Sequence, residues 1–335
     1  MRVVVAPDKL RGTATAAAVA GAVADVVLAG GGTVDQVPMA DGGEGTLEAL
    51  GGPNRTSLVT GPLGDPVEAG WRYERRTAVI EMARASGLEL VGGAEGNDPV
   101  AASTYGTGEL IGTAVELGAT RVLVAVGGSA TTDGGFGALR AMYPAHRFRG
   151  VELVVACDVA LRFLDAAEVF GPQKGATPAQ VRLLARRLER LADDYESEHG
   201  VDVRPLVGGG AAGGLAGGLA AIGAELVSGF DLVADEVDLY ERLDGADLVV
   251  TAEGFLDAES FDGKVVGGVA SFAADLGIPV LAVAGRVFDD EIRQPVADLG
   301  VDLEAVSLVE RFGEERSHHD TLAAIAEVVA ERLAR

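Results

Sequence analysis

The sequence predicts an α/β fold: a doubly wound, mainly parallel sheet domain with a second α/β domain inserted in it. Short apolar runs rich in β-branched residues alternate with helical runs at the start and in the last third of the chain, as in parallel sheets covered by helices. Residues 56–100 read instead as antiparallel strands joined by turns. We therefore expect residues 1–42 and 240–335 to form one domain, and residues 43–239 to form an inserted domain with a mixed sheet.

The chain opens with a predicted strand, residues 3–6, and a predicted helix from about residue 14 to residue 28. Asp8, Lys9 and Arg11 lie in the polar loop between them. Open α/β sheets bind ligands at the carboxyl ends of their strands. These three side chains are therefore candidates to meet a substrate carboxylate or phosphate.

A second predicted strand, residues 34–39, leads into a loop that holds two carboxylates among glycines. The candidates in this loop are Asp41, Gly42, Gly43 and Glu44. Such a loop suits a metal–phosphate group or a substrate hydroxyl. A plain turn remains an alternative, since Asp-Gly is a common turn dipeptide.

The stretch 127–135 follows a buried apolar strand, residues 122–126. Its candidate ligands are Gly127, Gly128, Ser129, Thr131 and Asp133. The glycines let backbone N–H groups approach an oxyanion, the hydroxyls add donors, and the carboxylate would hold a metal or take a proton. For this stretch alone a plain glycine-rich turn is an even alternative, but similar loops elsewhere in the chain favour binding.

Three further side chains lie in loops of the same kind. Thr107 stands at the predicted start of a helix, Asp158 follows the predicted strand 151–156, and Lys174 is the one cation of a glycine loop. Cys157 also ends that strand. It has no histidine partner nearby in the sequence, so we interpret it as a core residue and not as a nucleophile.

The rest of the chain alternates helices and strands. We expect helices at residues 178–199 and 320–333, and strands at residues 247–251, 279–284 and 301–308. Glu253 and Asp257 follow the first of these strands, and Lys264 enters the next helix. A cation at a helix N-terminus is unfavourable unless an anion lies beside it, which favours a phosphate nearby.

Gly208, Gly210 and Gly213 match the pattern G-x-G-x-x-G ahead of a helix. Residues 201–207 before them contain charges and a proline and make a poor central strand. We therefore interpret these glycines as helix-packing positions and keep an NAD-dependent oxidoreductase only as an alternative.

Composition narrows the class of function. The chain has 51 acidic and 27 basic residues and a formal charge of −24, which argues against nucleic acid or membrane as a partner. Apolar runs are too short for a membrane span or a signal peptide, so we expect a cytoplasmic protein. One cysteine and four scattered histidines exclude an internal disulfide and a zinc cluster of the usual spacing. The oligomeric state is open, with a homodimer as one option.

The recurring loops combine carboxylates, backbone amides, hydroxyls and a few cations, while histidine and cysteine are scarce. Phosphoryl transfer needs such a set: Mg²⁺ held by carboxylates, cations near the phosphoryl group, and a carboxylate that accepts the alcohol proton. The sequence therefore favours a phosphotransferase.

The same loops closely resemble those of the bacterial type I glycerate kinases. The resemblance rests on residues 7–8, 38–46, 60–64, 105–111, 127–135, 156–159, 170–176 and 210–215. It keeps its order over nearly the whole chain. It implies two α/β domains and phosphorylation of glycerate by ATP with Mg²⁺, in this family usually to 2-phosphoglycerate with release of ADP.

Loop positions and resemblance together give each candidate an expected role. The catalytic candidates are Asp8, Asp41, Asp133 and Lys174, with Asp8 or Asp133 as the favoured proton acceptor. The substrate- and phosphate-binding candidates are Lys9, Arg11, Gly42, Gly43, Glu44, Thr107, Gly127, Gly128, Ser129, Thr131, Glu253, Asp257 and Lys264. The metal candidates are Asp41, Asp133 and Asp158, and the expected partners are ATP and a small glycerate-like hydroxy acid.

The chain departs from the family pattern at three places. Phe255 replaces a cation of the usual Gly-Glu-Gly-Arg-Ile-Asp loop, residues 160–162 replace an Asn-Pro-Leu segment, and the chain is short between Tyr143 and Val151. A related hydroxy acid as substrate, or a binding protein without catalysis, is therefore an alternative.

Overall fold

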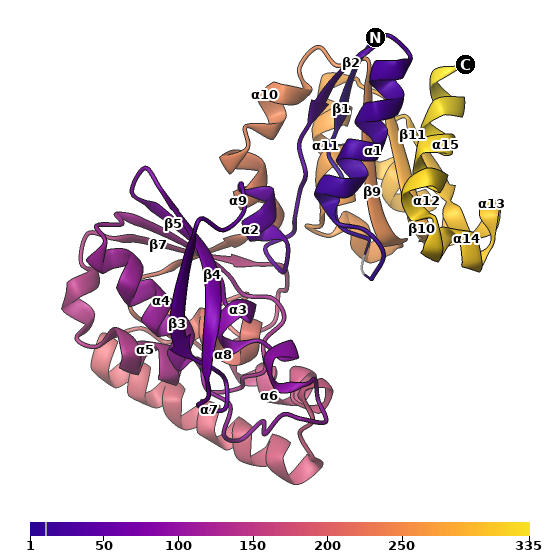
Figure 1. The fold of residues 1–335 in the computed structure, drawn as a ribbon. Helices are drawn as coiled ribbons and strands as arrows, with labels where there is room; N and C mark the ends of the chain where they lie inside the picture. Colours follow the sequence, from indigo (N-terminus) through magenta and orange to yellow (C-terminus); the bar gives the residue numbers. More distant parts are fainter. Residues whose placement is uncertain (11) are drawn as a thin grey trace. The chain divides into compact units, whose positions relative to one another are not determined.

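The computed structural model describes residues 1–10 and 12–335, and the chain forms two units (Figure 1). Unit 1 consists of Met1–Asp41, Glu48–Leu50 and Phe230–Arg335, and unit 2 consists of Gly42–Leu47 and Gly51–Gly229. Each unit contains one sheet with helices packed on it. The predicted α/β fold class is confirmed. Among the described residues, no helix has the length and apolar character needed to cross a membrane.

Unit 1 is built on a five-stranded sheet in the order β11-β10-β9-β1-β2, and all of its pairs are parallel. The strands are β1 (Arg2–Val5), β2 (Thr33–Gln36), β9 (Leu248–Leu256), β10 (Val280–Val287) and β11 (Leu303–Ser307). The central strands carry almost only buried apolar side chains on both faces, as expected for a parallel sheet covered on both sides.

The two faces of this sheet pack against different helices. Val3 and Val5 contact the cluster that contains α1 (Ala16–Ala29) and α15 (Thr321–Leu333). Val4 and Ala6 contact the cluster of α9 (Gly229–Glu236), α10 (Leu239–Leu243) and α11 (Val265–Leu276). The remaining helices of unit 1 are α12 (Asp289–Leu299), α13 (Leu308–Phe312) and α14 (Glu314–His319). This alternation makes the sheet doubly wound, with polar loops at its carboxyl edge.

Unit 2 has a mixed six-stranded sheet in the order β3-β4-β5-β6-β7-β8. The strands are β3 (Arg55–Thr60), β4 (Pro66–Glu74), β5 (Thr77–Glu81), β6 (Arg121–Ala125), β7 (Glu152–Cys157) and β8 (Glu225–Ser228). The pairs β3–β4 and β4–β5 are antiparallel, and the pairs from β5 to β8 are parallel. The parallel strands therefore end at one common edge.

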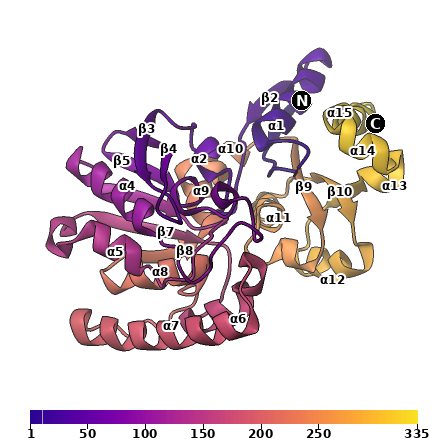
Figure 2. The ribbon, with the colours of Figure 1, turned by 60° about the horizontal axis from the view of Figure 1, so that its bottom comes forward.

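The main core of unit 2 lies between this sheet and three helices, α4 (Tyr105–Glu116), α5 (Phe136–Met142) and α8 (Ala211–Ala221). The long helix α7 (Pro178–His199), seen along one side of the unit in Figure 2, packs against α6 (Ala166–Phe170) and α8. The capping box of Thr177 and Gln180 fixes the start of α7, and Gly200 ends it. The short helix α3 (Ala83–Ser86) also belongs to unit 2, and the short helix α2 (Thr46–Ala49) has residues in both units.

Candidate active site

In unit 2, two predicted loops meet at the carboxyl edge of the parallel strands. A methyl group on Gly127 would lie 2.7 Å from Cα of Gly43, and one on Gly128 would lie 2.2 Å from Oε1 of Glu44. Gly128 also has a backbone φ of 70°, which residues with a side chain rarely adopt. Only glycine permits this approach, so the structure brings the loops at 42–44 and 127–128 together.

Glu81, which the sequence reasoning did not single out, anchors the first of these loops. Its side chain is buried, and Oε1 accepts hydrogen bonds from the backbone N–H groups of Gly45 (2.8 Å) and Leu47 (2.9 Å). Oε2 accepts one from Nε of Arg84. A lone carboxylate at the end of an apolar strand is the sequence signal that could have identified this residue.

Lys174 and Ser129 form a buried pair in the second loop. Nζ of Lys174 donates hydrogen bonds to Oγ of Ser129 and to the carbonyl oxygen of Thr131, both over 2.7 Å. The lysine side chain is only 3% exposed. Burial lowers the pKa of Lys174 to about 7, and the nearby carboxylate of Asp133 opposes this shift. The ammonium group thus serves the loop and does not face solvent.

Asp133 organises the turn that follows. Its two carboxylate oxygens accept hydrogen bonds from the backbone N–H and hydroxyl of Thr104 and from the N–H groups of Gly135 and Gly137. Burial raises the pKa of Asp133, and these hydrogen bonds act in the opposite direction. The geometry favours a structural carboxylate, because protein donors already occupy both oxygens.

Asn97 is a second residue that the sequence reasoning missed. Its Nδ2 atom donates to the carbonyl oxygens of Ala130 (3.0 Å) and Lys174 (2.9 Å), and so ties the lysine loop to the glycine-rich loop. Its sequence neighbourhood shows no motif that could have identified it.

Unit 1 carries the other group of predicted residues, near the carboxyl ends of β1 and β9. The predicted end of the strand at residue 251 was wrong, because β9 continues to Leu256 and includes Glu253. Glu253 is 7% exposed, and burial raises its pKa to about 8; Asp8 and Asp257 add to this shift, while Ser260 and Lys264 oppose it. Asp257 starts the 3₁₀ helix Ala258–Phe261 through a capping box with Ser260. Asp8, Asp257 and Lys264 thus lie close enough to Glu253 to affect its pKa, while Lys264 itself forms an ion pair with Glu259 over 3.4 Å.

Five further predicted site residues are Lys9, Thr107, Asp41, Asp158 and Arg11. Lys9 is half-buried beside Asp8 and donates its N–H to that carboxylate. Thr107 is fully buried in α4, and its hydroxyl lies 2.8 Å from that of Ser86. Asp41 ends the first segment of unit 1, and Asp158 is exposed after β7. Arg11 lies outside the described residues. The roles expected of all five stay predictions.

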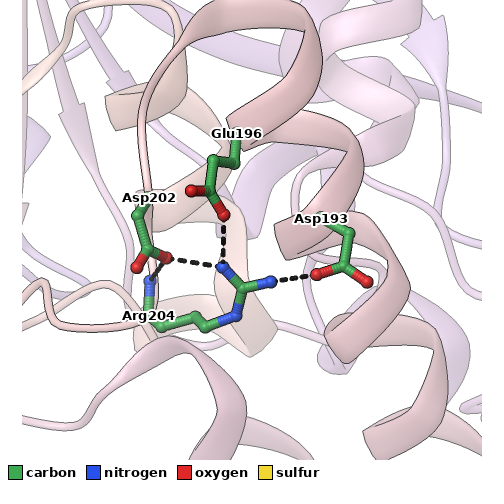
Figure 3. Close-up of polar contacts among 4 residues, drawn as sticks. All are labelled: Asp193, Glu196, Asp202 and Arg204. Carbon is green, nitrogen blue, oxygen red and sulfur yellow. Dashed lines mark hydrogen bonds and ion pairs between the residues drawn. The ribbon is translucent and has the colours of Figure 1, made fainter.

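The glycines of the G-x-G-x-x-G match are packing positions in the structure. A methyl group added to Gly210 would lie 2.3 Å from the carbonyl oxygen of Arg162. One added to Gly213 would lie 2.0 Å from the carbonyl oxygen of Thr131. Among the described residues, no strand directly precedes them; instead, Arg204 forms ion pairs with residues near the end of α7 (Figure 3). This supports the helix-packing interpretation.

Phe255, which replaces the cation of the family pattern, lies beside a cation from the neighbouring strand. Phe255, 63% exposed, pairs in register with Arg286 of the neighbouring strand β10. Arg286 forms an ion pair with Glu314 over 3.2 Å. A cation is therefore present at this level of the sheet, contributed by the adjacent strand.

In the described part of the chain, no three His, Cys, Asp or Glu side chains form a group that could hold a metal ion. Mg²⁺ in kinase sites commonly uses only one or two protein carboxylates and completes its shell with phosphates and water. The acidic loops are compatible with an ion that arrives with a nucleotide.

Comparisons with known proteins agree with this picture. A family model described as "Glycerate kinase family" matches residues 3–144 and 143–335. The chain is 38% identical to a glycerate 2-kinase of Escherichia coli, covering 87% of this chain and 86% of that protein. It is 39% identical to a glycerate kinase of Halalkalibacterium halodurans, covering 82% of each. A crystal structure of a Salmonella typhimurium protein assigned as glycerate kinase 2 superposes with a TM-score of 0.80 at 32% identity, over 100% of this chain and 98% of that one.

Proposed function

The chain belongs to the glycerate kinase family, and from this premise we propose that it phosphorylates glycerate with ATP, giving 2-phosphoglycerate and ADP. The observation that carries the proposal is the similarity to glycerate kinases over more than four fifths of the chain. The loops of unit 2 support it, because close-packed glycines, hydroxyls and a buried lysine are a common frame for phosphate.

In this proposal the loop 127–131 binds phosphate through its backbone N–H groups. Lys174 acts by fixing the loop, since its ammonium is held by Ser129 and the carbonyl oxygen of Thr131. Gly42, Gly43 and Glu44 lie against this loop and line the same site. Preorganised donors of this kind stabilise the charge that develops on a transferred phosphoryl group.

Mg²⁺ would neutralise phosphate charge when bound with the nucleotide. We propose Asp158 as a protein ligand in unit 2, because it is exposed at the end of β7. Asp41 remains a proposed ligand. Asp133 is the weaker candidate, since protein donors occupy its oxygens.

In unit 1, Asp8, Lys9, Glu253, Asp257 and Lys264 are proposed to bind substrate. Arg286 is a further candidate, because it lies opposite Phe255 and supplies positive charge near that position.

The test is a coupled assay of ADP release with ATP, Mg²⁺ and a panel of small hydroxy acids that includes D-glycerate. Turnover on D-glycerate supports the proposal, and analysis of the product identifies the phosphorylated hydroxyl. Turnover on another acid alone would move the proposal to that acid. Binding of ATP without turnover on any acid would contradict it and favour a family member that has lost catalysis.

Thermal unfolding distinguishes the proposed kinase from the alternative, an NAD-dependent oxidoreductase. A ligand that binds the folded state raises the melting temperature, so ATP should do so and NAD at equal concentration should not.

A further inference from the structure

Asp8 follows the end of β1, and Glu253 lies in β9, the strand that pairs with β1 in parallel. Val3, Val4 and Val5 of β1 pair with Leu248, Val249 and Val250 of β9. Hydrogen bonds from Ala6 N to Val250 O and from Asp8 N to Ala252 O, each 2.8 Å long, carry this register onward. The same register places Asp8 opposite Glu253.

Opposite residues of paired strands share a face of the sheet. Val4 and Val249 lie an even number of residues before Asp8 and Glu253, so strand alternation puts them on the same face. Both valines pack in the cluster that contains α11. The two carboxyl groups therefore lie on the α11 side of the sheet, at its carboxyl edge.

The burial of Glu253 is a second observation, independent of the strand register. Its side chain is 93% buried, the complement of its 7% exposure, and its Oε1 atom has no hydrogen-bond partner among the described residues. A buried polar atom without a partner is costly. Such an atom calls for a partner that the described residues do not supply, such as a water, an ion or a proton.

Among the described residues, charged groups of both signs lie around Glu253. Asp8 faces it from the end of β1 and Asp257 from the loop after β9, and both raise its pKa. Lys264, before α11, and the hydroxyl of Ser260 act in the opposite direction, and β10 presents Ala284 opposite it. Burial and the nearby Asp8 carboxylate thus favour the protonated form of Glu253.

We propose that Asp8 and Glu253 act as one proton-accepting pair in the phosphoryl transfer, an inference that rests on the proposed function. The hydroxyl oxygen of the acceptor attacks the γ-phosphorus of ATP. The new O–P bond forms as the bond from the γ-phosphorus to the β,γ-bridging oxygen breaks, and ADP leaves with that electron pair. The hydroxyl proton passes to the pair. Asp8, half-buried, meets the hydroxyl, and buried Glu253 is its positioning partner.

The experiment is the pH profile of kcat and kcat/KM with D-glycerate and ATP for wild type, Asp8→Asn, Glu253→Gln and the double variant. Each single change should lower kcat roughly 10²- to 10³-fold through loss of acid–base catalysis. The double variant should fall about as far as either single one, because both residues serve the same proton. Wild-type kcat/KM should rise with pH through a midpoint near pH 8 and level off above it, and Glu253→Gln should lose that rise.

Asp262→Asn is the matched control, since it removes an exposed carboxylate from the loop before α11 and should keep the wild-type profile. If Glu253→Gln does not fold, Asp8→Asn still tests the pair: without the Asp8 charge, the rise in kcat/KM should move to lower pH.

Two results would overturn the pair and leave the proposed function standing. One is a Glu253→Gln enzyme, or an Asp8→Asn enzyme, with the wild-type pH profile. The other is a double variant whose loss equals the product of the two single losses. A wild-type protein without turnover on any hydroxy acid would instead overturn the proposed function, and the pair with it.

Discussion

The ammonium group of Lys174 donates a hydrogen bond to the hydroxyl of Ser129 over 2.7 Å, across a separation of 45 residues in the chain. The bond joins the lysine loop to the glycine-rich loop inside unit 2. A buried cation held by a hydroxyl and a carbonyl oxygen can orient a phosphate loop without touching the phosphate.

Replacing Lys174 with methionine should lower turnover and stability together. The change leaves Oγ of Ser129 and the carbonyl oxygen of Thr131 without a donor, at a cost of about 1–3 kcal/mol for a buried unsatisfied group. Denaturant unfolding and the ADP-release assay measure the two effects. Lys174→Arg should recover part of the activity, and Arg182→Met, at an exposed position of α7, should change neither. Full activity in Lys174→Met would contradict the role given to this residue.

Glu81→Ala should release the loop at 42–47. Two backbone N–H groups lose their acceptor, and a misplaced loop should reduce kcat roughly 10- to 100-fold. Hydrogen exchange of the Gly45 and Leu47 amides should accelerate in the variant. Glu68→Ala removes an exposed carboxylate from β4 and serves as the control. Unchanged exchange at both amides would show that Glu81 does not hold the loop.

Gly128→Ala tests the close approach to Glu44. The new methyl group would lie 2.2 Å from Oε1 of Glu44, so the carboxylate must move and activity should fall. Gly150→Ala is matched in backbone strain, because its φ is 81°, but its methyl group would meet nothing within 4 Å. The positive φ should cost both variants about 1 kcal/mol of stability, and the clash with Glu44 should add to the loss in Gly128→Ala. Only Gly128→Ala should lose activity, and equal activities would argue against a shared site of the two loops.

The stability of the protein should depend on pH through Glu253. The folded state raises the pKa of Glu253 from 4.5 to about 8. Between these pH values the folded state keeps a proton that the unfolded state releases, so the free energy of unfolding should decrease as pH rises. Glu253→Gln should flatten this decrease, which denaturant titrations at pH 5, 6, 7 and 8 would measure. Parallel pH curves for the two proteins would show that Glu253 is ionised throughout.

Local sequence patterns predicted the regular elements well. The helix expected at 178–199 is α7, because a capping box and a terminal glycine mark its ends in the sequence. The strand expected at 301–308 is shorter: β11 ends at Ser307, whose hydroxyl caps α13. The strand β8 was missed, since only four residues form it and none of them is fully buried.

The candidate site was predictable as a set of loops but not as a set of contacts. Carboxylates and glycines after apolar strands are visible in the sequence. The pairing of Asp8 with Glu253 depends on strand register over 245 residues, and the hydrogen bonds of Asp133 depend on how α4 packs beside its loop. The sequence predicts that Asp133 holds a metal or accepts a proton, whereas the fold surrounds it with hydrogen-bond donors. Such differences arise from tertiary packing, which local patterns do not contain.

Cys157 is the one cysteine of the chain. Burial raises the pKa of its thiol to about 12, with a further contribution from Asp158. Since the thiolate is the reactive form, alkylating reagents and mild oxidants should leave this residue unmodified in the folded protein. A cysteine introduced at any exposed position could then be labelled selectively for fluorescence or spin-label distance measurements, without first removing the native one.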